Sequence, residues 1–278
     1  MNQEAVKPDY QSNPHFTFHA FGSGTDPIRE AGVFALRYQV YCLERGFLPC
    51  ENYPDGLEQD GYDPYSTYIA TYSRHGDLVG AMRLVKPPAT MPFPFHRHCP
   101  HISPNRAYPP DGECIELSRL VISKVFRRRA DDNLYGFSPQ FIEEYAPGSD
   151  AASRQAISTG QHKLPSSAAE RRNLRPVILL GLFREMYRHC KLNGISHWYV
   201  AMEKSLARLL KGLFYRTLDP IGEQVNYYGP VSPYLLSIPE LEETVSVRDP
   251  VLFAWFQDSR NYSGIQKPRP PIMVVNAA

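Results

Sequence analysis

Charged residues able to move protons or hold a charged substrate recur in the first half of the chain, each within an apolar or aromatic stretch. In chain order they are Arg37, Glu58, Asp60, Asp63, Arg83, Glu116 and Arg119. Isolated buried charges are costly, so acids and arginines in such settings are expected to pair around one polar site. A carboxylate there can act as a general base, and an arginine fork can hold a carboxylate group. We therefore expect one buried charged site.

A helix is needed to present the first arginine to this site. Asp26 is a favourable N-cap, Pro27 suits the first helical position, and apolar residues follow at helical spacing up to Gly46. Arg37 and Tyr41 are four residues apart, so they lie on the same side of the predicted helix. Both side chains can then face one cavity.

Strands are needed to present the other charges. Residues 67–72 and 78–85 are predicted to form a hairpin, with the acidic motif before its first strand and Arg83 near the end of its second. Residues 113–122 are predicted to form a central strand, on which Glu116 and Ser118 share one face.

Arg119 is the exception to this arrangement. Strict alternation along the central strand places its side chain on the opposite face, unless a β-bulge redirects it.

The remaining elements are read from their periodicity and from turn residues. We predict a strand at 15–20, an insertion at about 130–170, a helix at 176–192, a strand at 198–202, a helix at 205–212, strands at 225–228 and 234–238, and a helix after Asp249. This order predicts an α/β (α+β) domain with a mixed, mostly antiparallel sheet and helices on both faces.

Composition narrows the class of protein. The chain has 278 residues, 42% of them hydrophobic, and a net charge of +1, which does not favour nucleic acid as a partner. Its five cysteines form no CxxC pair and are odd in number, which favours a reducing compartment. With no apolar run approaching roughly 18 residues, we expect a cytoplasmic protein without a membrane span.

Four short motifs follow one another along the first half of the chain. They are the helical segment Leu36-Arg37-Tyr38-Gln39-Val40-Tyr41, the acids of Glu58-x-Asp60-x-x-Asp63, the strand ending Gly80-x-x-Arg83-Leu84, and Glu116-x-Ser118-Arg119. This order resembles that of the acyl-homoserine-lactone (autoinducer) synthases, a branch of the GNAT acyltransferase superfamily. It is still more similar to the N-acyl amino acid synthases and to acyltransferases associated with PEP-CTERM/exosortase systems.

The resemblance implies a GNAT-like fold in which the fourth and fifth strands splay apart and the acyl thioester lies between them. We expect this domain at 15–240, and the residues around it predict a disordered leader at 1–14 and a C-terminal helix with a loose Pro-rich tail at 241–278. Glu116 is the first candidate for the general base, and Glu58 the second. The residues expected to contact the acyl-pantetheine arm are Leu117, Val121, Trp198 and Val200.

The acceptor is expected to be the amine of an amino acid or a similar small molecule. The residues assigned to it are Arg37, Tyr41, Phe47, Asp60, Asp63, Arg83, Ser118 and Arg119. Phe47 stands where autoinducer synthases carry a tryptophan that helps to handle S-adenosylmethionine, so the acceptor's identity stays open. A purely structural ion-pair network is the alternative reading of these charges.

The donor is inferred from the segment after the central strand. Residues 124–129 contain no glycine, whereas coenzyme A-dependent GNAT enzymes use a glycine-rich loop there to hold the pyrophosphate. An acyl-phosphopantetheine thioester on acyl-carrier protein needs no such loop, and we expect it as co-substrate, with acyl-coenzyme A second and no permanently bound cofactor. Arg127, Arg128 and Arg129 would dock the acidic carrier, or they form an ordinary solvated loop.

Three alternatives to this N-acyltransferase remain: an S-adenosylmethionine-dependent acyl-homoserine-lactone synthase, a coenzyme A-dependent acetyltransferase, and a non-catalytic module that binds acyl groups or carrier protein. The cluster His96-Arg97-His98-Cys99 with His101 has no second ligand pair elsewhere, so no metal site is expected.

Overall fold

The computed structural model describes residues 16–126 and 175–258. Several predictions therefore lie outside the described residues: the leader at 1–14, the insertion at 130–170, and the docking role of Arg127, Arg128 and Arg129.

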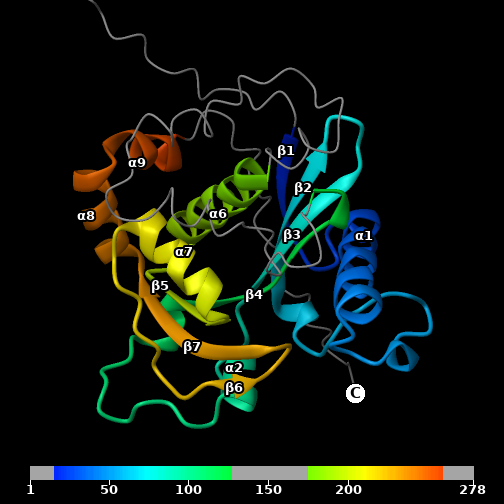
Figure 1. Ribbon diagram of the computed structural model, residues 1–278, viewed down its shortest axis with the longest axis horizontal. Helices are drawn as coiled ribbons and strands as arrows, with labels where there is room; N and C mark the ends of the chain where they lie inside the picture. The colour runs from blue at the N-terminus through cyan, green and yellow to red at the C-terminus, as the bar shows by residue number, and fades with distance from the viewer. Residues whose placement is uncertain (1–15, 127–174, 259–278) are drawn as a thin grey trace, which may run out of the picture.

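A single seven-stranded sheet forms the centre of the molecule (Figure 1). In spatial order its strands are β1 (Phe16–Gly22), β2 (Ser66–Ser73), β3 (Leu78–Val85), β4 (Cys114–Ile122), β5 (His197–Met202), β7 (Pro230–Ser237) and β6 (Val225–Asn226). Only β4 and β5 are parallel, and every other neighbouring pair is antiparallel. This confirms the predicted mixed, mostly antiparallel GNAT-like sheet.

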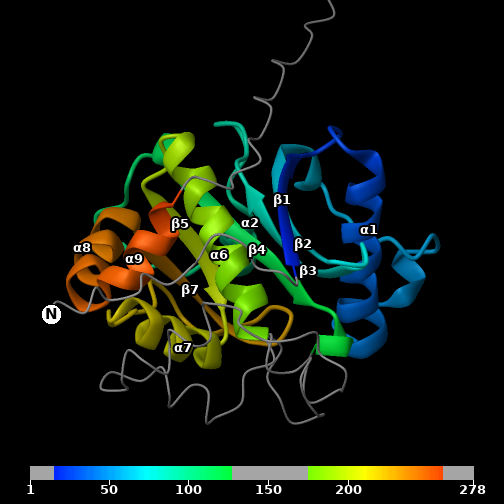
Figure 2. The same ribbon diagram turned by 90° about the horizontal axis from the view of Figure 1, so that it is seen from above.

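Helices cover both faces of the sheet (Figure 2). They are α1 (Pro27–Tyr38), α2 (Pro94–His98), α6 (Arg175–Leu192), α7 (Lys204–Phe214), α8 (Ile238–Arg248) and α9 (Pro250–Gln257). The helices α1 and α6 lie on opposite sides of β1, β2 and β3. Gly181 lets α6 approach closely, because a Cβ there would lie 2.0 Å from the ring of Phe18 on β1.

The start of α1 follows the predicted capping. Asp26 accepts a hydrogen bond of 3.1 Å from the backbone N–H of Arg29, and Pro27 occupies the first turn. After Tyr38 the chain continues as a wider π-helical turn, Gln39–Glu44, in which Tyr41 is buried. Such turns often occur at functional sites, and this one directs Tyr41 toward β4.

A β-bulge interrupts β4. Ala81 pairs with Val121, and Arg83, two residues further along β3, pairs with Ser118, three residues back along β4. The extra residue on β4 is accommodated where Arg119 adopts a left-handed conformation with φ of 52°. The predicted exception to alternation is therefore present, and its side chain turns toward the charged residues.

The parallel strands β4 and β5 separate partway along their length. They are paired from Cys114 with His197 to Leu117 with Val200, and the register ends there. The strand β4 continues to Ile122, and β5 continues to Met202 in pairing with β7. The predicted splayed gap therefore opens after Leu117.

Predicted boundaries were wrong in two places, and a short helix was not predicted. The helix α7 begins at Lys204 with Glu203 at the N-cap position, so Ser205 lies inside it. The strand predicted at 225–228 ends at Asn226, and the next begins at Pro230 because Tyr228 and Gly229 have positive φ angles and form a turn. The segment between β3 and β4, for which no helix was predicted, contains the short helix α2.

The last two helices complete the hydrophobic core. Leu241 and Val245 of α8 and Trp255 and Phe256 of α9 are buried in the same cluster as the sheet residues. Within 16–126 and 175–258, none of the helices has the length and apolarity needed to cross a bilayer.

Candidate active site

Three arginines and three carboxylates form a closed, alternating ring beside β3 and β4. Arg37 bonds Glu58 and Asp63, Arg83 bonds Asp63 and Asp60, and Arg119 bonds Asp60 and Glu58, which closes the circuit. Formal charges in the ring sum to zero, which is the condition under which buried ions are tolerated.

The geometry of the ring is tight. Arg37 donates to the two oxygens of Asp63 at 2.7 and 3.2 Å, and its Nε also donates to Glu58. Arg83 donates from Nη1 to Asp60 at 2.7 Å and to Asp63 at 3.0 Å. Arg37 and Glu58 are fully buried. Removing any one member would leave two partners uncompensated.

The ring holds its acids ionised. Burial acts to raise the pKa of Glu58, but the guanidinium groups of Arg119 and Arg37 outweigh it and leave that pKa below its ordinary value. Asp60 and Asp63 likewise have lowered pKa values, since burial is outweighed by Arg83 for the first and by Arg37 for the second. These carboxylates are fixed anions across the physiological pH range.

Arg119 is the ring member that faces outward. Its Nη2 lies 3.0 Å from both Glu58 and Asp60, and it also donates at 2.9 Å to the hydroxyl of Tyr228. Its guanidinium lies over the rings of Tyr228 and Tyr41, 4.6 and 5.6 Å from their centroids. The ring of ion pairs therefore anchors Arg119 from behind, and aromatic side chains cover it in front.

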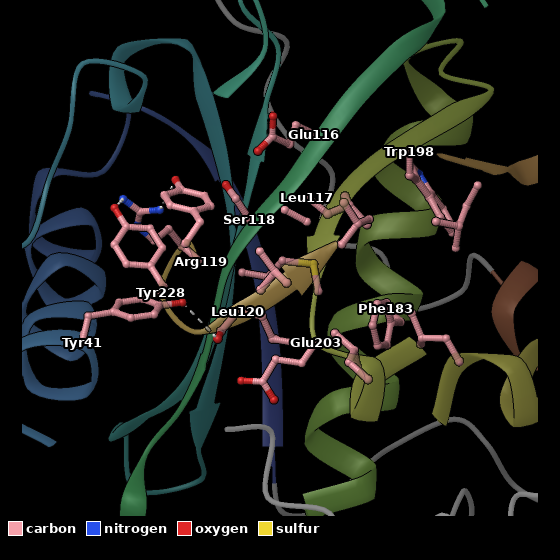
Figure 3. A pocket seen from close by; sticks show the side chains of 18 of the residues that line it. Tyr41, Glu116, Leu117, Ser118, Arg119, Leu120, Phe183, Trp198, Glu203 and Tyr228 are labelled. Atoms are coloured by element: carbon pink, nitrogen blue, oxygen red, sulfur yellow. Dashed lines mark hydrogen bonds between the residues drawn. The ribbon is translucent and has the colours of Figure 1, made fainter. Parts of the chain in front are cut away.

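A cavity occupies the gap between β4 and β5 (Figure 3). It encloses about 860 Å³ of atom-free space, including its open mouth. Its polar lining includes Glu116, Ser118 and Arg119, and Leu117, Val200 and Phe183 are among the many apolar residues of its wall. A mainly apolar space with a few convergent polar groups suits an acyl thioester.

Glu116 lies at the closed end of the gap, where its strand is still paired with β5 opposite Tyr199. Its side chain is 1% exposed and accepts a hydrogen bond of 2.9 Å from the backbone N–H of Phe95. Burial raises the pKa of Glu116 to about 8. It is thus the one acid of the predicted set that exchanges a proton near neutral pH.

Glu203 lies at the other end of the cavity, directly after β5 (Figure 3). Its side chain is half-buried and accepts a hydrogen bond of 3.1 Å from the hydroxyl of Ser205. It also lies close to the turn that carries Tyr228, because a Cβ on Gly229 would be 3.5 Å from its Oε1. The two glutamates therefore mark the closed and the open end of the gap.

The predicted site residues fall into two groups. Those that line the cavity are Tyr41, Glu116, Leu117, Ser118, Arg119, Trp198 and Val200. Those in the ion-pair ring behind it are Arg37, Glu58, Asp60, Asp63 and Arg83, besides Arg119. Arg83 also donates from Nε to Ser118 at 3.1 Å, which connects the ring to the cavity wall.

Two predicted residues, Phe47 and Val121, do not line the cavity, and neither does Glu58, the second candidate for the general base. Phe47 packs against Tyr41 and Tyr228 at centroid distances of 6.2 and 6.5 Å. Val121 is buried in the core opposite Ala81 and is not among the cavity-lining residues. Glu58 also does not line the cavity, and both its oxygens accept from arginines, so it lacks a free oxygen for proton transfer.

The sequence-based site lacked three polar residues that line the cavity, Tyr227, Tyr228 and Glu203, besides several apolar residues of its wall. The two tyrosines were predicted to be part of a strand at 225–228, although the glycine that follows them, Gly229, is a turn signal. Tyr227 stacks on His98 with ring centroids 3.7 Å apart, a contact between distant segments that no local pattern contains. Glu203 could have been found as an acid placed between a strand and a helix.

Comparison with known proteins agrees with the fold. Residues 36–135 match the family model described as an acetyltransferase (GNAT) domain. The fold is similar to that of BjaI, a CoA-dependent acyl-homoserine lactone synthase solved with SAM and isopentyl-CoA, with a TM-score of 0.51 and 18% identity over 84% of this chain and 89% of that chain. A search of curated protein sequences finds no match.

Looser similarities were found to two other solved structures. The acyl-homoserine lactone synthase LasI has a TM-score of 0.48 and 16% identity, covering 80% of this chain and 89% of its own. FeeM, an N-acyl amino acid synthase from uncultured soil microbes, has a TM-score of 0.45 and 12% identity, covering 84% and 96%.

Proposed function

We propose that this chain, an N-acyltransferase with a GNAT domain, transfers a fatty acyl group from the thioester of acyl-carrier protein to the amine of an amino acid or a similar small molecule. The observation that carries the proposal is the apolar gap between β4 and β5 with Glu116, whose pKa is about 8, at its closed end. The thioester lies in that gap, and the amine approaches from the side of Arg119.

The reaction needs one proton to leave the amine and one to reach the departing sulfur. The neutral amine nitrogen attacks the thioester carbonyl, a C–N bond forms, and the C–S bond breaks to release a thiol. Glu116, in its ionised form, takes the proton from the amine and returns it to the sulfur, so charge and atoms balance. It acts here as general base and then as general acid.

Backbone groups of β4 are suited to stabilise the oxyanion formed on the way. Beyond Leu117 this strand has no register partner on β5, so N–H groups that face the gap are open to the thioester carbonyl. Fixed donors aimed at a developing negative charge are a large contribution to catalysis of acyl transfer.

The acceptor's carboxylate is assigned to Arg119, with Arg83 behind it in the ring. Both arginines bond Asp60, so their guanidinium groups meet at that carboxylate. Nη2 of Arg83 is buried without a hydrogen-bond partner among the described residues, and Nη1 of Arg119 has only a long contact of 3.4 Å to Tyr227. Nη1 of Arg119 belongs to a cavity-lining residue and is open to a carboxylate, whereas Nη2 of Arg83 is enclosed behind the cavity wall.

An S-adenosylmethionine acceptor is the second candidate, because BjaI was solved with SAM. A cluster of Tyr41, Phe47 and Tyr228 could hold a sulfonium by cation–π attraction. The rings of Tyr41 and Tyr228 already cover the guanidinium of Arg119, however, and a second cation there would be repelled. We therefore favour an amino acid that brings a carboxylate to Arg119.

The choice of acyl-carrier protein as donor rests on the absence of glycine in residues 124–129, where a pyrophosphate-binding loop would need it. The rival donor is acyl-coenzyme A, because BjaI is a CoA-dependent enzyme.

The test is a matrix of purified protein with acyl-carrier protein or acyl-coenzyme A carrying the same acyl group, each with an amino acid pool or with S-adenosylmethionine, and mass spectrometry of the products. We expect N-acyl amino acids, formed faster from the carrier protein. A lactone product would show that S-adenosylmethionine, and not an amino acid, is the acceptor. Equal or faster turnover of acyl-coenzyme A would show that coenzyme A is the donor. If no pairing gives an acyl product, the protein only binds acyl groups or their carrier.

A further inference from the structure

A second cavity lies beneath α8 and α9, on the far side of β5 and α7 from the charged ring. Its lining residues come from five elements: Tyr187 of α6, Trp198 of β5, Phe214 of α7, Ile238, Leu241, Glu242 and Val245 of α8, and Leu252, Phe253 and Phe256 of α9. Only one of these ten residues carries a charge. A cavity of this composition suits a hydrocarbon better than a polar ligand.

Two residues line both cavities. Trp198 and Phe214 form part of the wall of the β4/β5 cavity and part of the wall of this second cavity. The two spaces are therefore separated, at that place, by two aromatic side chains.

The two partition residues are held differently. The indole N–H of Trp198 donates to the sulfur of Cys190 at 3.2 Å, and its strand is paired on both sides, which fixes the ring. Phe214 is the last residue of α7 and is followed by Tyr215 in a left-handed conformation. Its ring meets Phe183 edge-on, at 6.4 Å between centroids. The side chain of Phe214 can therefore move with less loss of packing and hydrogen bonding than that of Trp198.

From these observations we propose that the second cavity is the binding site for the distal end of long acyl chains, and that Phe214 is the residue that controls how far a chain reaches. This inference rests on the proposed function, because it assumes that the acyl group enters the β4/β5 cavity. The substrate class it names is a long-chain acyl thioester.

The route between the cavities supports a hydrocarbon as the occupant. The wall that leads from the gap to the partition is formed by apolar residues of α6 and α7, including Phe183, Leu206 and Leu210. At the far cavity, the only charged residue, Glu242, is already bonded to Tyr187 and Lys191. A polar ligand would find no free partner among these lining residues, whereas each buried methylene improves binding by about fourfold.

Two substitutions test the proposal in opposite directions. Leu252→Trp should fill the second cavity from α9, and Phe214→Ala should open the partition. The matched control is Val251→Trp, which places the same indole on the neighbouring residue of α9, whose side chain is 43% exposed. Circular dichroism and thermal unfolding check that each variant is folded.

The readout is binding of non-hydrolysable acyl-pantetheine analogues with octanoyl, dodecanoyl and hexadecanoyl chains, measured by calorimetry, and then turnover of the matching thioesters. Leu252→Trp should weaken hexadecanoyl binding by at least about tenfold and leave octanoyl binding unchanged. Phe214→Ala should strengthen hexadecanoyl binding relative to octanoyl, and the double variant should lose that gain.

Two results would overturn the proposal: equal effects of Leu252→Trp and Val251→Trp on hexadecanoyl binding, or a chain-length profile that Phe214→Ala leaves unaltered. Failure of the proposed function looks different. In that case no amide forms from any thioester, while the binding profile still reports whether the second cavity holds the chain end.

Discussion

The guanidinium of Arg119 lies 3.0 Å from the carboxylate of Asp60, although simple alternation along β4 would place these groups on opposite faces of the sheet. The bulge at Arg119, with its φ of 52°, brings the side chain to the face where Ser118 meets Arg83. One irregular residue thus connects the buried ring of ion pairs to the wall of the acyl cavity.

Arg119→Lys should therefore impair the enzyme without unfolding it. A lysine keeps the charge, but it lacks the planar fork through which Arg119 donates to Glu58 from Nε and Nη2 and directs Nη1 toward Tyr227. We expect kcat/KM for the amine acceptor to fall about tenfold to a hundredfold, mainly through KM, which corresponds to loss of one charge-assisted hydrogen bond. Steady-state kinetics measure it, and Arg208→Lys on the exposed face of α7 is the control. An unchanged KM would remove Arg119 from acceptor binding.

Arg37→Met should be strongly destabilising. Arg37 is fully buried and bonds two ring carboxylates, so its removal leaves Glu58 and Asp63 without a compensating charge. We expect a loss of about 3–5 kcal/mol in the free energy of unfolding, measured by denaturant titration. Arg29→Met on the same helix breaks an exposed ion pair with Asp26 and should cost about 0–1 kcal/mol. Similar losses for both variants would contradict a coupled ring.

The rate should depend on pH in a defined direction. The pKa of Glu116 is raised to about 8, so at pH 7 most molecules hold the protonated form, which cannot accept a proton from the amine. We expect kcat to rise with pH and to level off above about pH 8. A pH–rate profile at saturating substrates measures this, with pH-stability controls. A rate that falls with pH through this range would assign Glu116 as a general acid instead.

The same shift predicts how stability depends on pH. The pKa of Glu116 is about 8 in the folded protein and 4.5 as an ordinary glutamate, so between these values the folded state holds a proton that the unfolded state has lost. The stability of the wild-type protein contributed by this group is complete below pH 4.5 and is lost as pH rises toward 8.

Glu116→Gln removes that dependence, because glutamine does not titrate. As pH rises through this window, the free energy of unfolding of the variant should increase relative to that of the wild type by up to about 1.4 kcal/mol per pH unit. Urea denaturation of both proteins at several pH values measures the difference. A constant difference across the window would mean that Glu116 has no raised pKa.

Local patterns predicted most of the sheet and much of the charged site. The strand Leu78–Val85 was predicted with its observed ends, since a turn at Gly76 and a run of apolar residues define it. The seven charged residues were expected to pair because each lay in an apolar stretch. Six of them form one ring, whereas Glu116 is bonded to the backbone N–H of Phe95 instead. The bulge that orients Arg119 depends on register between β3 and β4, which is a long-range property that alternation cannot supply.

Other parts were missed for identifiable reasons. Tyr227 and Tyr228 were read as strand because aromatic residues favour strands, but the chain turns there with Tyr228 at φ of 54°. The start of α8 carries a helix signal that was overlooked: Ser237 accepts from the backbone N–H of Glu240, with a proline in the first turn. The second cavity depends on how α8 and α9 pack, and no short motif describes that.

The most direct test of the account is a single turnover of acyl-carrier protein thioester with an amino acid acceptor at pH 8.5, comparing wild type with Glu116→Gln and the exposed control Glu223→Gln. Released thiol and N-acyl amino acid are quantified together. We predict one amide for each thiol in the wild type and the control, and a loss of at least about a hundredfold in rate for Glu116→Gln with thioester binding retained. Thiol release without amide, or a Glu116→Gln variant as fast as wild type, would contradict acyl transfer to an amine by Glu116.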